Sequence, residues 1–329
     1  MRICIVGAGA IGGWFAAHCG HKLAGEVQLS ALARGATLAA LREHGLRMDS
    51  GGERIVVPIT ASDVPAELGA QDLIVLAVKG PALAGVAPAV RQLLDQSPGA
   101  HVLVAMNGVP WWFFDGLEGP CRGLRLQSVD AGGVVAGLIP AERVIGSVVH
   151  ASCAVPEPGL VRHVMGMGLI LGDPAGGRPA HIEALAALLQ RAGFNATVSE
   201  RIQKDIWYKL WGNMTVNPIS ALTGATTDRI MNDELVLGFV SAVMREASAI
   251  GDQIGCPVGQ TPEQRHEITR KLGAFKSSML QDVEAGRTIE LDALVSSVRE
   301  IGQHIGTATP NIDAMLGLTR LMAQTRGLL

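Results

Sequence analysis

One segment in the second half of the chain combines a lysine with two asparagines at regular spacing. Lys209, Asn213 and Asn217 are four residues apart, within the sequence KLWGNMTVNP. On an α-helix this spacing places them within about 80° of one another. The neighbouring residues are mainly apolar, and a lysine and two amides are costly to bury without partners. The stripe therefore faces either solvent or a wet cleft that binds a polar substrate, and we expect Pro218 to end or kink the helix directly afterwards.

A second group of polar residues lies downstream, in SSMLQD at residues 277–282 and in GRTIELD at residues 286–292. Thr288 could cap a following helix, with Asp292 in its first turn. We interpret Asp292 as such a helix-start residue. For Glu290 two interpretations stay open, namely helix-start chemistry and a role in an active site.

A glycine-rich motif near the N-terminus is typical of a dinucleotide-binding turn. The GxGxxG sequence consists of Gly7, Ala8, Gly9, Ala10, Ile11 and Gly12. It follows an apolar run at residues 2–6 and opens a helical pattern. In such a turn the first glycine permits the turn, the second lets a pyrophosphate approach the backbone, and the third lets the helix pack on the strand. The helix N-terminus then offers N–H groups to the phosphates, so we expect the segment to bind NAD(H) or NADP(H).

The end of the second expected strand distinguishes between these two nucleotides. An NAD site usually carries Asp or Glu there, which binds the ribose 2′-hydroxyl. This chain has Ala33-Arg34-Gly35 instead. A guanidinium can pair with a 2′-phosphate, so Arg34 favours NADP(H), the alternative being a solvated surface arginine.

The expected secondary structure differs between the two halves of the chain. Over the first 110 residues strands alternate with helices, which is typical of a parallel doubly wound sheet with the glycine turn at its carboxyl edge. Strands are expected at 2–6, 27–33, 55–59, 72–78, 101–106 and 196–199, and helices at 11–24, 36–44 and 180–193. Residues 124–172 carry further strand signals.

After about residue 200 the strand signals vanish. Helical periodicity covers 201–216, 233–251, 262–285 and 290–305. We therefore expect an α/β plus all-α chain, with a Rossmann-type NADP-binding domain at 1–200 and a helical substrate-binding and catalytic domain at 201–329.

Composition argues against several classes of function. The formal net charge is −3 and no basic run stands out, so nucleic acid is not an expected partner. Five cysteines without CxxC spacing argue against a disulfide framework or a metal site and fit the cytoplasm. No signal peptide and no apolar run of about 18 residues is visible, so no membrane partner is expected. The apolar helical region permits a homodimer without requiring one.

Together these motifs resemble those of the ketopantoate reductases (2-dehydropantoate 2-reductases). The resemblance covers nearly the whole chain. It is carried by GxGxxG at 7–12, the turn at Arg34-Gly35, Val78-Lys79, Asn107-Gly108, KxxxNxxxNP at 209–218, and the SSMLQD…GR…ELD block at 277–292. The last two blocks are far more specific than the first.

The resemblance implies an active site in a cleft between the two domains, where NADPH reduces a 2-oxo acid to a 2-hydroxy acid. In pantothenate and coenzyme A biosynthesis the product is (R)-pantoate. By motif, Lys209 is implied to be the general acid, and Glu290 to contact the lysine or the substrate. Asn213 and Asn217 are implied to bind the substrate's hydroxyl, and Ser278 its carboxylate.

Three further roles follow from the same resemblance. Lys79 and Asn107 are implied to lie between nicotinamide and substrate, and Arg34 to anchor the 2′-phosphate. The chemistry supports the residue types, since an ammonium stabilises the charge that hydride transfer leaves on a ketone oxygen. A neighbouring carboxylate raises the pKa of such a lysine, whereas burial lowers it.

Two alternatives remain. A paralogous reductase would act on another 2-oxo acid, and the aromatic run Trp111–Phe114 could select it or merely cover the domain interface. A non-catalytic NADP-binding redox sensor would need none of the polar residues of the second half. His150 and His163 lack a partner motif, and we expect no catalytic role for them.

Overall fold

The computed structural model describes residues 1–329, which form two compact units. Unit 1 comprises residues 1–106 and 134–202, and unit 2 comprises residues 107–133 and 203–329. A single boundary at residue 200 places residues 107–133 in the first domain, whereas in the structure they pack within unit 2. No helix combines the length and apolar character needed to cross a membrane.

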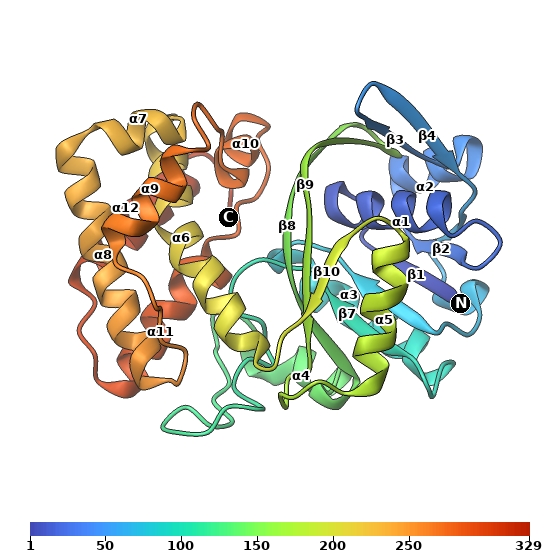
Figure 1. The fold of residues 1–329 in the computed structure, drawn as a ribbon, viewed down its shortest axis with the longest axis horizontal. Helices are drawn as coiled ribbons and strands as arrows, with labels where there is room; N and C mark the ends of the chain where they lie inside the picture. Colours follow the sequence, from blue (N-terminus) through green and yellow to red (C-terminus); the bar gives the residue numbers. More distant parts are fainter. The chain divides into compact units, whose positions relative to one another are not determined.

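Unit 1 is built on one ten-stranded sheet with the order β4-β3-β9-β8-β7-β6-β1-β2-β5, and β10 pairs with β9 (Figure 1). The strands are β1 (Arg2–Val6), β2 (Gln28–Leu32), β3 (Leu46–Ser50), β4 (Glu53–Val57), β5 (Thr60–Ser62), β6 (Leu73–Leu76), β7 (His101–Val104), β8 (Val144–Glu157), β9 (Leu160–Gly172) and β10 (Asn195–Val198). Neighbours from β5 to β8 run parallel, which confirms the predicted α/β class. The β8–β9 and β3–β4 pairs are antiparallel, so the sheet is mixed towards one side.

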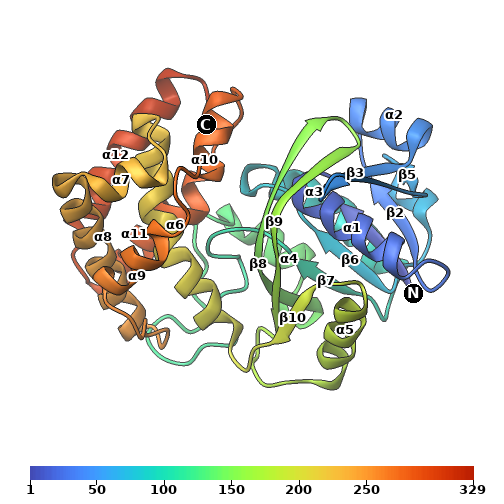
Figure 2. The same cartoon turned by 45° about the horizontal axis from the view of Figure 1, so that its top comes forward.

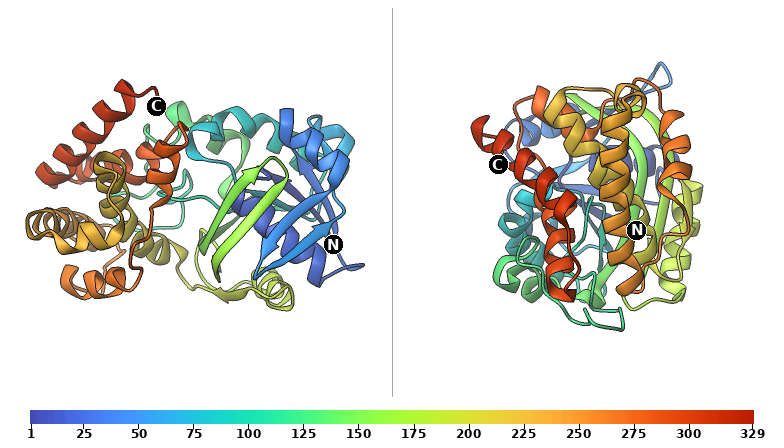
Figure 3. Two further views of the ribbon diagram at one scale, coloured as in Figure 1. Left: turned by 90° about the horizontal axis from the view of Figure 1, so that it is seen from above. Right: turned by 90° about the vertical axis from the view of Figure 1, so that its left-hand side faces the viewer.

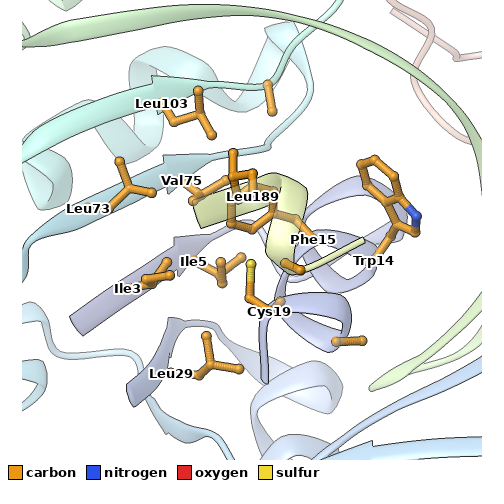
Figure 4. Close-up of a cluster of buried hydrophobic side chains, with 14 of the residues drawn as sticks. Ile3, Ile5, Trp14, Phe15, Cys19, Leu29, Leu73, Val75, Leu103 and Leu189 are labelled. Carbon is orange, nitrogen blue, oxygen red and sulfur yellow. The ribbon is translucent and has the colours of Figure 1, made fainter. Parts of the chain in front are cut away.

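The helices of unit 1 cover this sheet (Figure 2). They are α1 (Ala10–Lys22), α2 (Gly35–His44), α3 (Leu83–Asp95), α4 (Val134–Leu138) and α5 (Ala180–Arg191), with short 3-10 turns at Pro65–Leu68, Gly80–Ala82, Ala131–Gly133 and Ala141–Arg143. The central strand β6 reads LIVL and is buried throughout, as expected for a parallel strand covered on both faces. In Figure 4, Trp14 and Phe15 of α1 and Leu189 of α5 lie with strand residues such as Ile5 and Val75 in one apolar cluster.

Unit 2 is helical, and α8 packs beside α11 and α12 within it (Figures 2 and 3). Its helices are α6 (Ile202–Thr223), α7 (Thr227–Asn232), α8 (Glu234–Gln253), α9 (Pro262–Arg270), α10 (Ser278–Glu284), α11 (Ser297–Ile305) and α12 (Pro310–Thr325). A π-helical turn at Asp292–Ser296 leads directly into α11. All ten strands lie in unit 1, which agrees with the predicted loss of strand signals after residue 200.

Two local predictions for unit 2 are wrong, and a third, for Pro218, is narrowed. The helical pattern at 262–285 forms two helices, because the chain turns between them at Gly273, whose φ is +62°. Helix α6 contains Pro218 and continues to Thr223, so the proline does not end the helix, and a kink is the predicted effect that remains. Thr288 caps no helix. The next helical turn begins at Asp292, its N-cap residue is Leu291, and no side chain caps this end.

Candidate active site

The glycine turn, the predicted dinucleotide-binding segment, joins β1 to α1 and borders open space at Gly9. Gly7 has a φ of +96°, and a Cβ there would lie 2.8 Å from the Ala77 carbonyl oxygen. A Cβ on Gly12 would collide with the Gly7 carbonyl, so only glycine lets α1 approach the strand this closely. A Cβ on Gly9 would meet no heavy atom within 4 Å. The second glycine therefore borders open space, which fits the approach of a pyrophosphate to the backbone.

Strand register places Arg34 and Lys79, the other two residues predicted to contact the nucleotide in unit 1, at the same edge of the sheet. Val6 of β1 is paired with Leu32 of β2 on one side and with Leu76 of β6 on the other. Arg34 follows β2 by two residues, is exposed, and precedes α2. Lys79 follows β6 by three residues. The glycine turn, Arg34 and Lys79 thus share the carboxyl edge of three adjacent parallel strands, where α/β sheets bind ligands.

The lysine–asparagine stripe lies on α6 in unit 2. Lys209, Asn213 and Asn217 all fall inside this helix, as their spacing predicts. Asn217 is 7% exposed, and Lys209 and Asn213 are half-buried, so the stripe is not a freely solvated face. The structure therefore does not support the interpretation of Lys209, Asn213 and Asn217 as a solvent-facing stripe.

Lys209 contacts a residue that lies 102 positions earlier in the chain. Its Nζ donates a hydrogen bond of 2.9 Å to Oδ1 of Asn107, the first residue of unit 2. Burial lowers the pKa of the Lys209 ammonium to about 8, and the negative charge of Glu290 acts in the opposite direction. A lysine with this pKa is mostly protonated at neutral pH and can still release its proton readily, which suits a general acid.

Ser278 begins α10, and Glu290 lies two residues before the π-helical turn. Glu290 is half-buried, and its charge acts on Lys209. Ser278 is exposed at the first residue of α10, whereas its neighbour Ser277 caps the helix by accepting from the Leu280 amide at 3.1 Å. Asp292 lies in the first turn after Leu291 and accepts from Ser296 Oγ at 2.8 Å, which fits its interpretation as a helix-start residue.

The aromatic run Trp111–Phe114 is buried, with at most 3% of each side chain exposed. The ring of Phe113 lies 6.1 Å from that of Trp207 on α6, measured between centroids, and 5.0 Å from that of Phe114. At least Phe113 therefore packs inside unit 2. Sequence patterns miss this contact, because no local signal assigns a loop after a Rossmann strand to a distant helix.

The two histidines are placed in the sheet of unit 1, on β8 and β9. His163 contacts Ser50 Oγ through Nδ1 at 3.0 Å and the Gly166 carbonyl through Nε2 at 2.8 Å. Both of its ring nitrogens are therefore engaged in local structure. His150 is exposed on β8. A Cβ on Gly166 would collide with the His150 carbonyl oxygen. No group of three or more His, Cys, Asp or Glu side chains is arranged to hold a metal ion.

Comparison with known proteins adds to this geometry. The family model described as "Ketopantoate reductase PanE/ApbA" matches residues 3–176, and its C-terminal counterpart matches residues 201–323. A 2-dehydropantoate 2-reductase from Mesorhizobium japonicum is 45% identical over 329 residues, covering 99% of each chain.

Solved structures show the same likeness. A crystal structure from Ralstonia solanacearum MolK2, assigned to the ketopantoate reductases, has a TM-score of 0.95 and 55% identity, and the match covers 100% of this chain and 99% of the other. D-mandelate dehydrogenase, solved with NADH and anilino(oxo)acetate, has a TM-score of 0.84 at 21% identity with both chains fully covered. At that identity the second likeness shows the fold alone.

Proposed function

Because the chain belongs to the ketopantoate reductase family and is an oxidoreductase acting on CH–OH groups, we propose that it reduces 2-dehydropantoate to (R)-pantoate with NADPH. The observation that carries the mechanism is the Lys209–Asn107 hydrogen bond, in which a half-buried ammonium is held by a neutral amide oxygen. This hydrogen bond holds the ammonium in place as a proton donor, and the charge of Glu290 favours its protonated form.

Lys209 serves as the general acid in this proposal. When bound, the dinucleotide supplies the hydride. Lys209 Nζ stabilises the negative charge that develops on the substrate's ketone oxygen and donates its proton there. Glu290 favours the charged form of the lysine, which burial alone would disfavour.

The remaining polar residues of unit 2 bind the substrate in this proposal. Asn213 and Asn217 lie one and two turns beyond Lys209 on α6 and can both donate to and accept from a hydroxyl. The exposed hydroxyl of Ser278 binds the carboxylate. The substrate is thus a small 2-oxo acid with a hydroxyl group.

NADPH is the proposed cofactor because Arg34 stands where an NAD site carries an acidic residue. The space beside Gly9 and the close packing at Gly7 and Gly12 support the binding of a dinucleotide at this turn. Lys79 at the same sheet edge, and Asn107 beside Lys209, are proposed to contact the nicotinamide end.

We also propose that the protein acts in the cytoplasm, in pantothenate and coenzyme A biosynthesis. All five cysteines are free, which fits a reducing compartment. The apolar helices of unit 2 allow a homodimer, and a dimeric ketopantoate reductase from Staphylococcus aureus shares the fold at 18% identity and a TM-score of 0.76.

The second candidate is the same chemistry on another 2-oxo acid, since the D-mandelate dehydrogenase fold accommodates an aryl-substituted oxo acid analogue. Steady-state kinetics with NADPH on 2-dehydropantoate, 2-oxoisovalerate and benzoylformate separate the two. We expect kcat/KM for 2-dehydropantoate to exceed the others by at least about tenfold, the discrimination that one or two well-placed polar contacts provide. A higher kcat/KM on another acid would replace the named substrate. Binding of NADPH without turnover of any acid would favour the redox sensor.

A further inference from the structure

Residues 107–133 form a loop of unit 2 whose beginning rests directly on the π-helical turn. Gly108 has a φ of +84°, and a Cβ there would lie 2.7 Å from Ala293 Cβ and would also collide with the Ala293 carbonyl oxygen. The next amide, that of Val109, donates to this same oxygen at 2.9 Å. A side chain at position 108 would therefore push the loop off the turn.

The π-helical geometry makes the Ala293 carbonyl available for this contact. In an α-helix that carbonyl would accept from the amide of Ser297, four residues later. Here the Ser297 amide donates to Asp292 instead, one residue further back. The Ala293 oxygen accepts from the Val109 amide and from Ser297 Oγ, the latter at 2.9 Å. Single π turns inside helices are frequent at functional sites, and this one turns a backbone carbonyl outward to the loop.

The far end of the loop is attached to the same helical segment. The Glu300 carboxylate accepts from the Gln127 amide at 2.7 Å, from the Ser128 amide at 3.0 Å and from Ser128 Oγ at 2.6 Å. Glu300 lies seven residues after Ala293, which is about two helical turns and hence nearly the same face. Segment 292–305 therefore holds both ends of loop 107–133.

The attachment at Gly108 lies next to the residue that contacts Lys209. Asn107 directly precedes Gly108 and accepts the hydrogen bond from Lys209 Nζ. Glu290, the charged group that acts on Lys209, lies just three residues before Ala293. We propose that segment 292–305, through the Ala293 carbonyl and the Glu300 carboxylate, is a positioning device that fixes the Asn107 amide against the Lys209 ammonium. The proposal rests on the assignment of Lys209 as general acid.

Gly108→Ala tests the first attachment. We expect kcat to fall about tenfold to a hundredfold, the value of one hydrogen bond to a charged group. KM for NADPH should change by a smaller factor than kcat, because the glycine turn and Arg34, which are proposed to bind the rest of the dinucleotide, lie in unit 1. The alkaline limb of the kcat profile should move to lower pH, since the Asn107 oxygen favours the charged lysine. A change that merely loosened the fold would not move this limb.

Gly123→Ala is the matched control. Gly123 lies in the same loop with a φ of +71°, but a Cβ there would meet no heavy atom within 4 Å. It carries the same left-handed backbone cost without the contact to Ala293. We expect near-wild-type kcat and a smaller drop in unfolding temperature than in Gly108→Ala, because position 123 carries the backbone cost without the collision. Equal kcat in the two variants would overturn the proposal.

A double-mutant cycle with Asn107→Ala shows whether the device acts through Asn107. In that background Gly108→Ala should lower kcat by less than about threefold, because the group that it positions is already gone. Fully additive losses would contradict the proposal. If Gly108→Ala does not fold, Glu300→Ala replaces it, with Glu300→Gln expected to recover part of kcat by keeping one acceptor oxygen. Unchanged kcat in Glu300→Ala would count against the device.

Lys209→Ala separates this inference from the proposed function. Near-wild-type turnover in Lys209→Ala would remove the general acid and with it the basis of the inference. An inactive Lys209→Ala together with equal kcat in Gly108→Ala and Gly123→Ala would remove the positioning device alone.

Discussion

Replacing Lys209 by methionine should lower activity and raise stability at the same time. Methionine has a similar length and no charge, so it keeps the packing of α6 and removes the ammonium. Burial lowers the pKa of Lys209 from its usual value near 10.5 to about 8. That difference corresponds to about 3 kcal/mol of unfavourable free energy for the charged form in the folded chain. Asn107 Oδ1 loses its donor, which costs about 1 kcal/mol, so the net gain at pH 7 is about 2 kcal/mol.

The pH dependence fixes the sign of this prediction. Between pH 8 and pH 10.5 the unfolded chain still binds a proton at Lys209 that the folded chain has released. The stability of the wild type therefore rises with pH over this range relative to the variant. The advantage of Lys209→Met should be full below pH 8 and should vanish at about pH 9.5 to 10. Near pH 10.5 the variant should be about 1 kcal/mol less stable than wild type, because only the loss at Asn107 remains.

Urea unfolding of both proteins at pH 7 and pH 10 measures these differences, and NADPH oxidation with the 2-oxo acid measures turnover. Turnover should fall by about three to five powers of ten, the combined value of a general acid and an electrostatic contact to the oxyanion. Lys204→Met, at an exposed lysine on the same helix, is the control and should change stability by less than about 0.5 kcal/mol. A Lys209→Met variant that is less stable than wild type at pH 7, or that retains a tenth of its turnover, would refute the reasoning.

Two further predictions concern charge. Arg34→Ala should weaken NADPH binding about tenfold or more and leave NADH binding nearly unchanged. The reason is that only NADPH carries the 2′-phosphate that a guanidinium can bind. Fluorescence titrations measure both affinities, and equal losses for the two nucleotides would show that Arg34 has no part in selecting NADPH. Glu290→Gln should move the alkaline limb of the kcat profile to lower pH, because the carboxylate raises the pKa of Lys209. A limb at unchanged pH would mean that Glu290 does not act on the lysine.

The parts of the fold with a strong local pattern could be predicted from the sequence. The buried run at β6, the turn at Gly7 and the spacing of Lys209 and Asn213 each reflect constraints within a few residues. β3 was not expected, because its sequence LRMDS alternates too weakly to mark a strand before its partners are known.

The partner of Lys209 was beyond such reasoning. The NG step at Asn107 could be linked to the site only through the family resemblance, since the contact spans 102 positions. The π turn depends on which donor reaches the carbonyl of Ala293, and that donor comes from the loop at Val109. Hydrophobic periodicity carries no information about such a contact.

The division of the chain has a consequence for how the protein can be cut or recombined. The chain crosses between the units three times, after residues 106, 133 and 202. A fragment of residues 203–329 would lack Phe113, which packs on Trp207, and Asn107, which accepts from Lys209. Exchange of catalytic units between relatives therefore has to transfer two separate segments together. A chimera joined only near residue 200 would pair one parent's lysine with the other parent's amide.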